Sequence, residues 1–267
     1  MLEVELCNLH NHMPVKIQVF MRAMTILDHK NFRLSLGERR FLERIGYLEF
    51  YYRRVPHQIT SAIYKFVRAP EHADALAKGD VYVSTLNACR AYECSERGDP
   101  GEGTLTHFIN RFVGTGDEWK AADPLRGRRL DIAGPMNVVI SDCELTLVAR
   151  DGYVFCATDT FDFERMAESF GHYCVRIRNP LFFQLALCHR LAINLPVLEH
   201  WGQLVQYTGR NIVDTQPLVS REFFLKPKRY EGQREFRIVA MAHDPAHRYE
   251  PHTVRVDNIS RFIERIR

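Results

Sequence analysis

The clearest pattern of apolar and polar positions begins at residue 63. The sequence IYKFV, residues 63–67, is a short run of β-branched and aromatic residues that predicts a strand. Successive side chains of a strand point to opposite faces of its sheet. We therefore expect Lys65 on one face, and Tyr64 and Arg68 on the other.

A helix and a second strand are predicted directly afterwards. Pro70 suits the first position of a helix, Glu71 suits the positive end of the helix dipole, and Gly79 suits a left-handed C-cap. The sequence VYVST, residues 81–85, predicts the next strand.

Apolar runs downstream predict further strands at residues 136–140, 145–149, 152–158, 174–178, 204–208 and 235–241. Helices are predicted from Asp162 onward, at residues 181–191 and at residues 260–266. The helices and strands are interspersed without the regular repeat of a doubly wound sheet. The predicted fold class is therefore α+β.

Residues 1–57 are predicted to form a helical extension, because four apolar residues share one helix face. They are Phe41, Leu42, Ile45 and Leu48. Residues 58–267 then make up the main domain. Within it, residues 87–135 are rich in Gly, Arg and Asp, which predicts an insertion of long loops with short helices.

The composition is that of a folded, globular protein. Of the 267 residues, 46% are hydrophobic and 26% are charged, which excludes wholesale disorder and a fibrous repeat. No apolar run approaches the roughly 18 residues that span a bilayer, and the start lacks the pattern of a signal peptide. We therefore expect a cytoplasmic protein. The seven cysteines are odd in number and never form a C-x-x-C pair, which fits reduced thiols.

Positive charge is concentrated toward the end of the chain. Residues 221–267 hold eleven Lys or Arg and seven Asp or Glu, a net charge of +4, whereas the other 220 residues carry −1. Such an excess favours a phosphate-bearing partner, although a solvated basic face is the commoner explanation.

Familiar signatures of nucleotide hydrolysis and metalloproteolysis are missing from the sequence, including Walker A, G-x-G-x-x-G after a strand, and H-E-x-x-H. Cys7, His10 and His12 have the chemistry of metal ligands but lack a paired second cluster. No metal site is predicted.

Three short motifs, each predicted on or beside a strand, occur in an order that resembles the ADP-ribosyltransferase superfamily. They are Lys65 in IYKFVR, Cys156-Ala157-Thr158 in GYVFCATD, and Gln233-x-Glu235 in YEGQREFRIV. The resemblance covers about residues 60–245. It extends to a group of bacterial proteins with a Tyr-Lys-Tyr/Phe first strand and a late Tyr-Glu-x-x-x-Glu-Phe-Arg strand. It implies a split β-sheet core, NAD as co-substrate and no metal.

The resemblance makes Glu235 the catalytic carboxylate. Cleavage of the glycosidic bond of NAD leaves positive charge on the ribose, which a neighbouring carboxylate stabilises. Gln233, two residues earlier, would aim its amide at the acceptor. The residues alone leave another interpretation open, in which Glu235 only pairs with Arg234 or Arg237 at an exposed strand end.

Residues expected to bind NAD surround this carboxylate. Lys65 stands where the family usually has Arg or His, with Arg68 as a substitute. Cys156 and Thr158 stand where the family has a Ser-Thr-Ser or Tyr motif. The remaining candidates are aromatic: Tyr64, Phe155, Phe170 and Tyr173. We expect Lys65, Thr158 and Glu235 to face one cleft from neighbouring strands.

In that superfamily the Gln-x-Glu order goes with acceptors such as asparagine side chains or guanine bases. A guanine acceptor fits the basic segment together with Arg126, Arg128 and Arg129. The late loop would supply phosphate contacts and a stacking face to such an acceptor. The residues expected to do so are Arg229, Tyr230 and Arg234.

The predicted function is therefore an NAD-dependent ADP-ribosyltransferase that acts on nucleic acid or on a protein side chain. Stand-alone members of the superfamily suggest a toxin or phage-defence effector, with an antitoxin or regulatory protein as a further partner. One alternative is a ribonuclease-type toxin that uses some of the twelve histidines. Another is a non-catalytic nucleic-acid-binding module on a degenerate transferase fold, which the departures at Lys65 and Cys156 suggest.

Overall fold

The computed structural model describes residues 62–92, 99–123, 134–193, 198–216, 220–242, 244 and 246–267. Several features singled out in the sequence lie outside these residues: the helical extension, Cys7, His10, His12, Arg126, Arg128 and Arg129.

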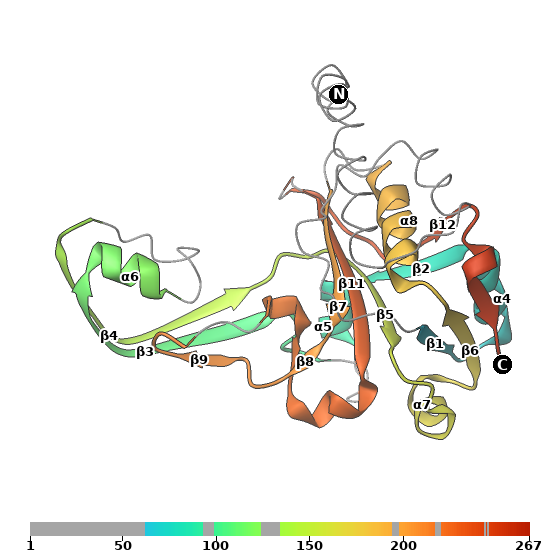
Figure 1. The fold of residues 1–267 in the computed structure, drawn as a ribbon, viewed down its shortest axis with the longest axis horizontal. Helices are drawn as coiled ribbons and strands as arrows, with labels where there is room; N and C mark the ends of the chain where they lie inside the picture. The colour runs from blue at the N-terminus through green and yellow to red at the C-terminus, as the bar shows by residue number, and fades with distance from the viewer. Residues whose placement is uncertain are drawn as a thin grey trace, which may run out of the picture.

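An eight-stranded antiparallel sheet forms the body of the molecule (Figure 1). Six strands follow one another in the order β12-β2-β5-β1-β6-β13, and β11 pairs with both β5 and β7. Their bounds are β1 (Ile63–Val67), β2 (Asp80–Thr85), β5 (Tyr153–Thr158), β6 (Tyr173–Ile177), β7 (Leu198–Leu204), β11 (Glu235–Ala242), β12 (His252–Arg255) and β13 (Ile263–Arg265). Together with the helices below, this makes the fold α+β, as predicted.

Helices pack on both faces of this sheet. The helices α4 (Pro70–Lys78) and α8 (Pro180–Ala192) cover one face, and α7 (Phe163–Phe170) packs on the other. As the sequence predicts, α4 begins at Pro70 and is closed by Gly79, whose φ of 105° is left-handed. None of the helices in the described ranges is both long and apolar enough to cross a membrane.

Alternation along the central strands decides which side chains enter the main core. Ile63 of β1, Phe155 of β5 and Ile238 of β11 pack into the core beneath α4 and α8. Residues one position away, such as Cys156 and Arg237, point to the opposite face. That opposite face carries the cavity described below.

One edge of β5 is shared by two strands. Its beginning pairs with β2 through Tyr153 and Thr85, and its end pairs with β1 through Thr158 and Tyr64. Between these pairs the carbonyl of Cys156 accepts a hydrogen bond of 2.7 Å from Lys65 Nζ. A side chain thus satisfies a backbone group in the gap between β2 and β1 along this edge of β5. We call this gap the split.

A long ribbon extends away from the sheet (Figure 1). It consists of β3 (Thr104–Thr115) and β4 (Asn137–Val148), with β9 (Asn211–Val213) parallel to β3 and α6 (Gly116–Ala122) at its far end. The remaining elements are short: α5 (Leu86–Ala91), β8 (Gln206–Tyr207), β10 (Leu225–Lys226), η2 (Glu222–Phe224), η3 (Lys228–Gln233) and η4 (Ser260–Phe262).

Some of the predicted elements differ from the structure. The strands expected at residues 136–140 and 145–149 are a single strand, β4. Residues 87–135 hold short helices, as expected, but part of the expected loops is a strand over residues 104–115, because Leu105, His107 and Ile109 alternate into the interior. The helix expected at residues 260–266 is η4 followed by β13, because Ile263 pairs in register with Ile177 at the sheet edge. So short a helix is marginal by itself, whereas the sheet edge supplies both hydrogen bonds and a core contact.

Candidate active site

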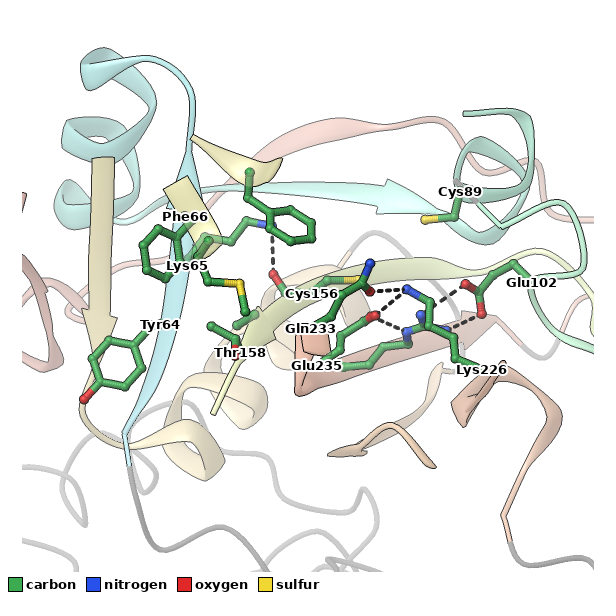
Figure 2. A pocket seen from close by; sticks show the side chains of 14 residues that line it. Tyr64, Lys65, Phe66, Cys89, Glu102, Cys156, Thr158, Lys226, Gln233 and Glu235 are labelled. Atoms are coloured by element: carbon green, nitrogen blue, oxygen red, sulfur yellow. Dashed lines mark hydrogen bonds and ion pairs between the residues drawn. The ribbon is translucent and has the colours of Figure 1, made fainter. Parts of the chain in front are cut away.

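A cavity lies on the sheet face opposite α4 and α8 (Figure 2). Its volume is about 110 Å³. Since an engineered cavity of about 150 Å³ binds benzene, this space suits a single ring rather than a whole dinucleotide. Its lining includes five residues from the sequence motifs: Lys65, Cys156, Thr158, Gln233 and Glu235.

The ends of β5 and β11 bring two of these residues side by side. Glu235 begins β11 and lies in register with Thr158, the last residue of β5. Cys156 shares their face, because residues two apart on a strand point the same way. The structure thus brings Thr158 and Glu235 to one cavity, as the sequence analysis expects.

The carboxylate of Glu235 is held by two cations. Its Oε1 accepts a hydrogen bond from Arg237 Nε at 2.7 Å, and its Oε2 accepts one from Lys226 Nζ at 2.7 Å. The side chains of Glu235, Lys226 and Arg237 are 7%, 5% and 1% exposed. The ion pair with Arg237 that the sequence left open therefore exists, but it is buried. Arg234 pairs elsewhere.

Arg237 connects Glu235 with a second carboxylate. Its Nη2 lies 3.1 Å from Glu102 Oε2, and its Nη1 donates to Glu102 and, at 2.6 Å, to the carbonyl of Phe223. We call Glu102, Lys226, Glu235 and Arg237 the buried charge cluster. It holds two carboxylates and two cations, so the formal charges cancel, as buried ions require.

These contacts keep Glu235 and Lys226 ionised. Burial by itself would raise the pKa of Glu235, but the charges of Arg237 and Lys226 outweigh it and hold this pKa well below its usual range. Burial would lower the pKa of Lys226, yet Glu235 raises it above its ordinary value. In contrast, burial raises the pKa of the Cys156 thiol, so this cysteine keeps its proton at neutral pH.

Lys65 reaches the cavity from the other side of the sheet. It lies in register with Val175, which belongs to the main core, so its side chain leaves β1 opposite to the face of Glu235. Its ammonium reaches the split, where it bonds to Cys156 and lies 5.2 Å from the ring centroid of Phe155. The expectation of a shared face is therefore wrong for Lys65. Among the described residues its ammonium has no carboxylate partner.

Aromatic side chains form the wall of the cavity beside β1. Tyr64, Phe66 and Phe170 line this wall. The ring centroid of Phe161 lies 5.3 Å from that of Tyr64, and Phe161 is 46% exposed. Such a wall suits the face of a flat ring.

Three predicted NAD-binding residues do not line the cavity. Phe155 points into the core, where its ring centroid lies 4.8 Å from that of Phe183. Tyr173 packs against the core side of the sheet, with the guanidinium of Arg265 5.4 Å from its ring centroid. Arg68 follows the end of β1 and is exposed. Strand alternation directs Phe155 and Tyr173 away from the cavity, and Arg68 lies beyond the end of β1, so their positions do not support the cofactor contacts expected of them.

The late loop also differs from expectation. Tyr230 is only 5% exposed, and the cations of Lys226 and Arg229 lie 5.2 and 4.9 Å from its ring centroid, so it offers no face for a stacked base. Arg234 forms two hydrogen bonds with Asp159, of 2.8 and 2.9 Å. Burial would raise the pKa of Asp159, but the bonds from Arg234 outweigh it and lower this pKa. Of the three predicted acceptor contacts, only Arg229 is both exposed and without an acidic partner among the described residues.

The chemistry available at the cavity is that of carboxylate, amide, hydroxyl, thiol and ammonium groups. Among the described residues, no histidine lines it. The same part of the chain contains no group of three or more His, Cys, Asp or Glu side chains able to hold a metal ion. The described lining therefore offers no imidazole to a ribonuclease-type mechanism.

The sequence does not single out three residues that hold Glu235 or its partner Arg237. They are Glu102, Lys226 and Tyr207, whose hydroxyl accepts the backbone N–H of Glu235 at 2.7 Å. A signal existed for Arg237, since two charged residues two positions apart in the otherwise apolar EFRIVAMA must share one face of a buried strand. No comparable signal marks Glu102, which comes from a turn far away in the chain.

No protein-family model, curated protein or solved structure matches this chain.

Proposed function

We propose that this chain is an NAD-dependent ADP-ribosyltransferase that reacts at the Glu235 cavity, with a nucleic-acid base, guanine in the first place, or a protein side chain as acceptor. One observation carries the proposal. A buried carboxylate that stays ionised borders a cavity of the size of one ring, with an aromatic wall beside it.

The proposed reaction breaks the bond between C1′ of the ribose and the nicotinamide nitrogen. The electron pair of that bond stays with nicotinamide, which leaves as a neutral ring. A lone pair of the acceptor forms the new bond to C1′, and the acceptor releases its proton to water. Between these events the ribose carries positive charge, which Glu235 stabilises.

The contacts of Glu235 leave part of its carboxylate available. The two oxygens have four lone pairs together, and Arg237, Lys226 and the Cys156 thiol use three of them. Glu235 can therefore also accept a hydrogen bond from a ribose hydroxyl. Because both cations hold the carboxylate in place, little reorganisation is needed when charge develops.

The surrounding groups fit the two ends of such a substrate. Tyr64, Phe66 and Phe170 offer ring faces for nicotinamide. Lys65 uses one of its three donors on Cys156, which leaves two for a phosphate oxygen. Gln233, whose Oε1 accepts from Lys226 at 2.9 Å, stands next to the carboxylate and would orient the acceptor.

The buried charge cluster favours a second candidate, a binding module without catalysis. Lys226 and Arg237 neutralise Glu235, so the field in the cavity is weaker than that of a lone carboxylate. Such a module would bind a ligand and leave its glycosidic bond intact.

Incubation with NAD labelled in its adenylate half, together with separate pools of RNA, DNA and cell protein, separates these candidates. We expect release of nicotinamide and transfer of label to a nucleic-acid pool. Label in the protein pool would make a side chain the acceptor. If no pool is labelled and no nicotinamide is released, the transferase proposal fails and the binding module remains.

A further inference from the structure

One row of residues connects the edge of the sheet with the cavity. The row runs, in register across five neighbouring strands, through Glu264 of β13, Arg176 of β6, Tyr64 of β1, Thr158 of β5 and Glu235 of β11. Residues in register share a sheet face, and neighbouring strands lie about 4.8 Å apart. Arg176 is therefore about 14 Å from Glu235 along this surface, three strand spacings away.

Positive charge gathers where this row meets the edge. Arg176 and Arg178 share the carboxylate of Glu264, with N–O distances of 3.4 and 3.7 Å. Arg178 also donates to the backbone carbonyl of Arg261 at 2.7 Å, which holds its side chain at the edge. We call Arg176 and Arg178 the edge arginines. Arg176 and Arg178 are 43% and 51% exposed, so phosphates can reach both side chains.

We propose that the edge arginines bind single-stranded nucleic acid, with its phosphates on the guanidinium groups and one base led along the row to the cavity. Guanidinium groups match phosphate geometry and supply the salt-dependent part of binding. The exposed ring of Phe161, beside Tyr64, supplies a stacking face on the way. Because nicotinamide fills the cavity, the base meets the ribose at the mouth of the cavity, and it can do so only after it has left its stack, which favours a single strand over a duplex.

This inference rests on the proposed function only for what happens to the base. The position of the edge arginines distinguishes a binding site from an ordinary solvated basic face. They lie on the same surface as the cavity, one strand away from Tyr64, which lines the cavity. On a solvated basic face, only the amount of positive charge would affect the binding of nucleic acid, and the edge on which the arginines lie would not matter.

The opposite edge of the sheet offers matched controls. Arg255 of β12 is 52% exposed and pairs with Asp80 at 3.0 Å and with Asp257 at 3.8 Å, much as Arg178 pairs with Glu264. It lies at the other end of the strand order. Arg255→Gln removes one positive charge at an exposure comparable to that of Arg178, and Asp257→Asn removes one negative charge; both lie away from the row.

The test is fluorescence anisotropy of short labelled RNA and DNA strands, and of the duplex, without NAD, between about 50 and about 200 mM salt. We expect single strands to bind more tightly than the duplex. The double variant Arg176→Gln/Arg178→Gln should lose about tenfold in affinity at low salt. Its slope of log K against log salt should fall by about 1.4, since each lost phosphate contact removes about 0.7 for a single strand. Arg255→Gln should bind like the wild type.

Removal of the Glu264 carboxylate tests the same surface by an expected gain in affinity. Glu264→Gln should tighten binding severalfold, whereas Asp257→Asn should not. Thermal melting verifies that the variants remain folded, which we expect because exposed ion pairs contribute little to stability.

Several results would overturn the inference. The double variant could bind as tightly as the wild type with the same salt slope, Arg255→Gln could lose as much affinity as the double variant, or anionic lipid vesicles could bind the protein where the oligonucleotides do not. Release of nicotinamide from NAD by wild-type protein that binds no oligonucleotide would refute this inference and leave the NAD chemistry standing. Binding without turnover of NAD would support this inference and remove the transferase.

Discussion

Glu235 has two roles that a single substitution affects together. It is the proposed catalytic group, and it is also the partner of two buried cations. Removing one member of a buried ion pair leaves an uncompensated charge, which costs stability independently of any effect on chemistry. Tests at this residue must therefore separate activity from folding.

Glu235→Gln should lower nicotinamide release by about 10²-fold or more, because the amide keeps the size of the side chain but not the charge opposite the ribose. It should also lower the free energy of unfolding by about 3 kcal/mol, since Lys226 loses its carboxylate. The double variant Glu235→Gln/Lys226→Met also removes the buried cation that has lost its carboxylate, so it should regain part of the stability without the activity. Nicotinamide release and thermal melting measure the two effects.

Glu231→Gln is the matched control, because Glu231 is exposed on η3 four residues earlier. We expect it to melt and react like the wild type. An inactive Glu231→Gln beside an active Glu235→Gln would show that the register of the motif is wrong, and full activity in both would remove the transferase proposal.

Gln233→Ala should separate transfer from hydrolysis. Lys226 keeps its bond to Glu235 when the amide is lost, so the carboxylate should stay in place. We expect loss of label transfer to the acceptor while slow release of nicotinamide to water continues. Equal losses of transfer and release would contradict an acceptor role for Gln233.

At the scale of elements, the junction of α7 and β6 brings Met166 and Phe170 to the cavity. Gly171 closes α7 with a φ of 124°, and its own N–H donates to Ala167 at 3.0 Å. A Cβ at this position would overlap the backbone of Val67 at the end of β1. Only glycine allows β1 and the end of α7 to approach so closely.

Gly171→Ala should therefore lower the free energy of unfolding by about 2 kcal/mol or more, from the combined cost of the left-handed backbone and the overlap. Denaturant unfolding measures the change. Gly209→Ala is the comparison, because a Cβ there would meet its nearest neighbour only at 3.9 Å. Similar losses in both variants would mean that the close approach at Gly171 is not what matters.

The strands around the cavity show which features of an element can be predicted from sequence and which cannot. Period-two alternation predicts β1, β5 and β11 correctly, because it depends only on neighbours in the chain. It also places Phe155 and Tyr173 near the motifs without saying that they face the core. For β13 the local pattern is ambiguous, and the free edge of β6 decides in favour of a strand.

At the scale of the whole molecule, burial of His200 makes stability depend on pH. This histidine of β7 is 7% exposed. Its Nδ1 lies 3.2 Å from the amide nitrogen, Nε2, of Gln184 on α8. Burial lowers the pKa of His200 to about 4. The unfolded chain, with an ordinary pKa of about 6.5, therefore binds the proton more readily than the folded protein does.

Stability from this group is present above pH of about 6.5 and is lost as pH falls toward the folded pKa. Between pH 7 and pH 5 the loss should be on the order of 2 kcal/mol. Denaturant unfolding at both pH values should show a smaller difference for His200→Gln than for the wild type. The exposed His252 gives the control, and an unchanged pH difference in His200→Gln would contradict the assignment.

The sequence by itself determined what depends on local order: the α+β class, the strands that carry Thr158 and Glu235, and helix ends such as Pro70 and Gly79. These follow from alternation, caps and turn residues, whose effects act over a few positions along the chain. The tertiary structure alone decided the partners of Glu235, because Glu102 reaches Arg237 across 135 positions of chain. It also decided that Tyr230 is covered, that Lys65 enters through the split, and that Arg176 lies in one row with the cavity. Contacts between distant segments depend on strand register and on the burial of whole surfaces, which no local pattern records.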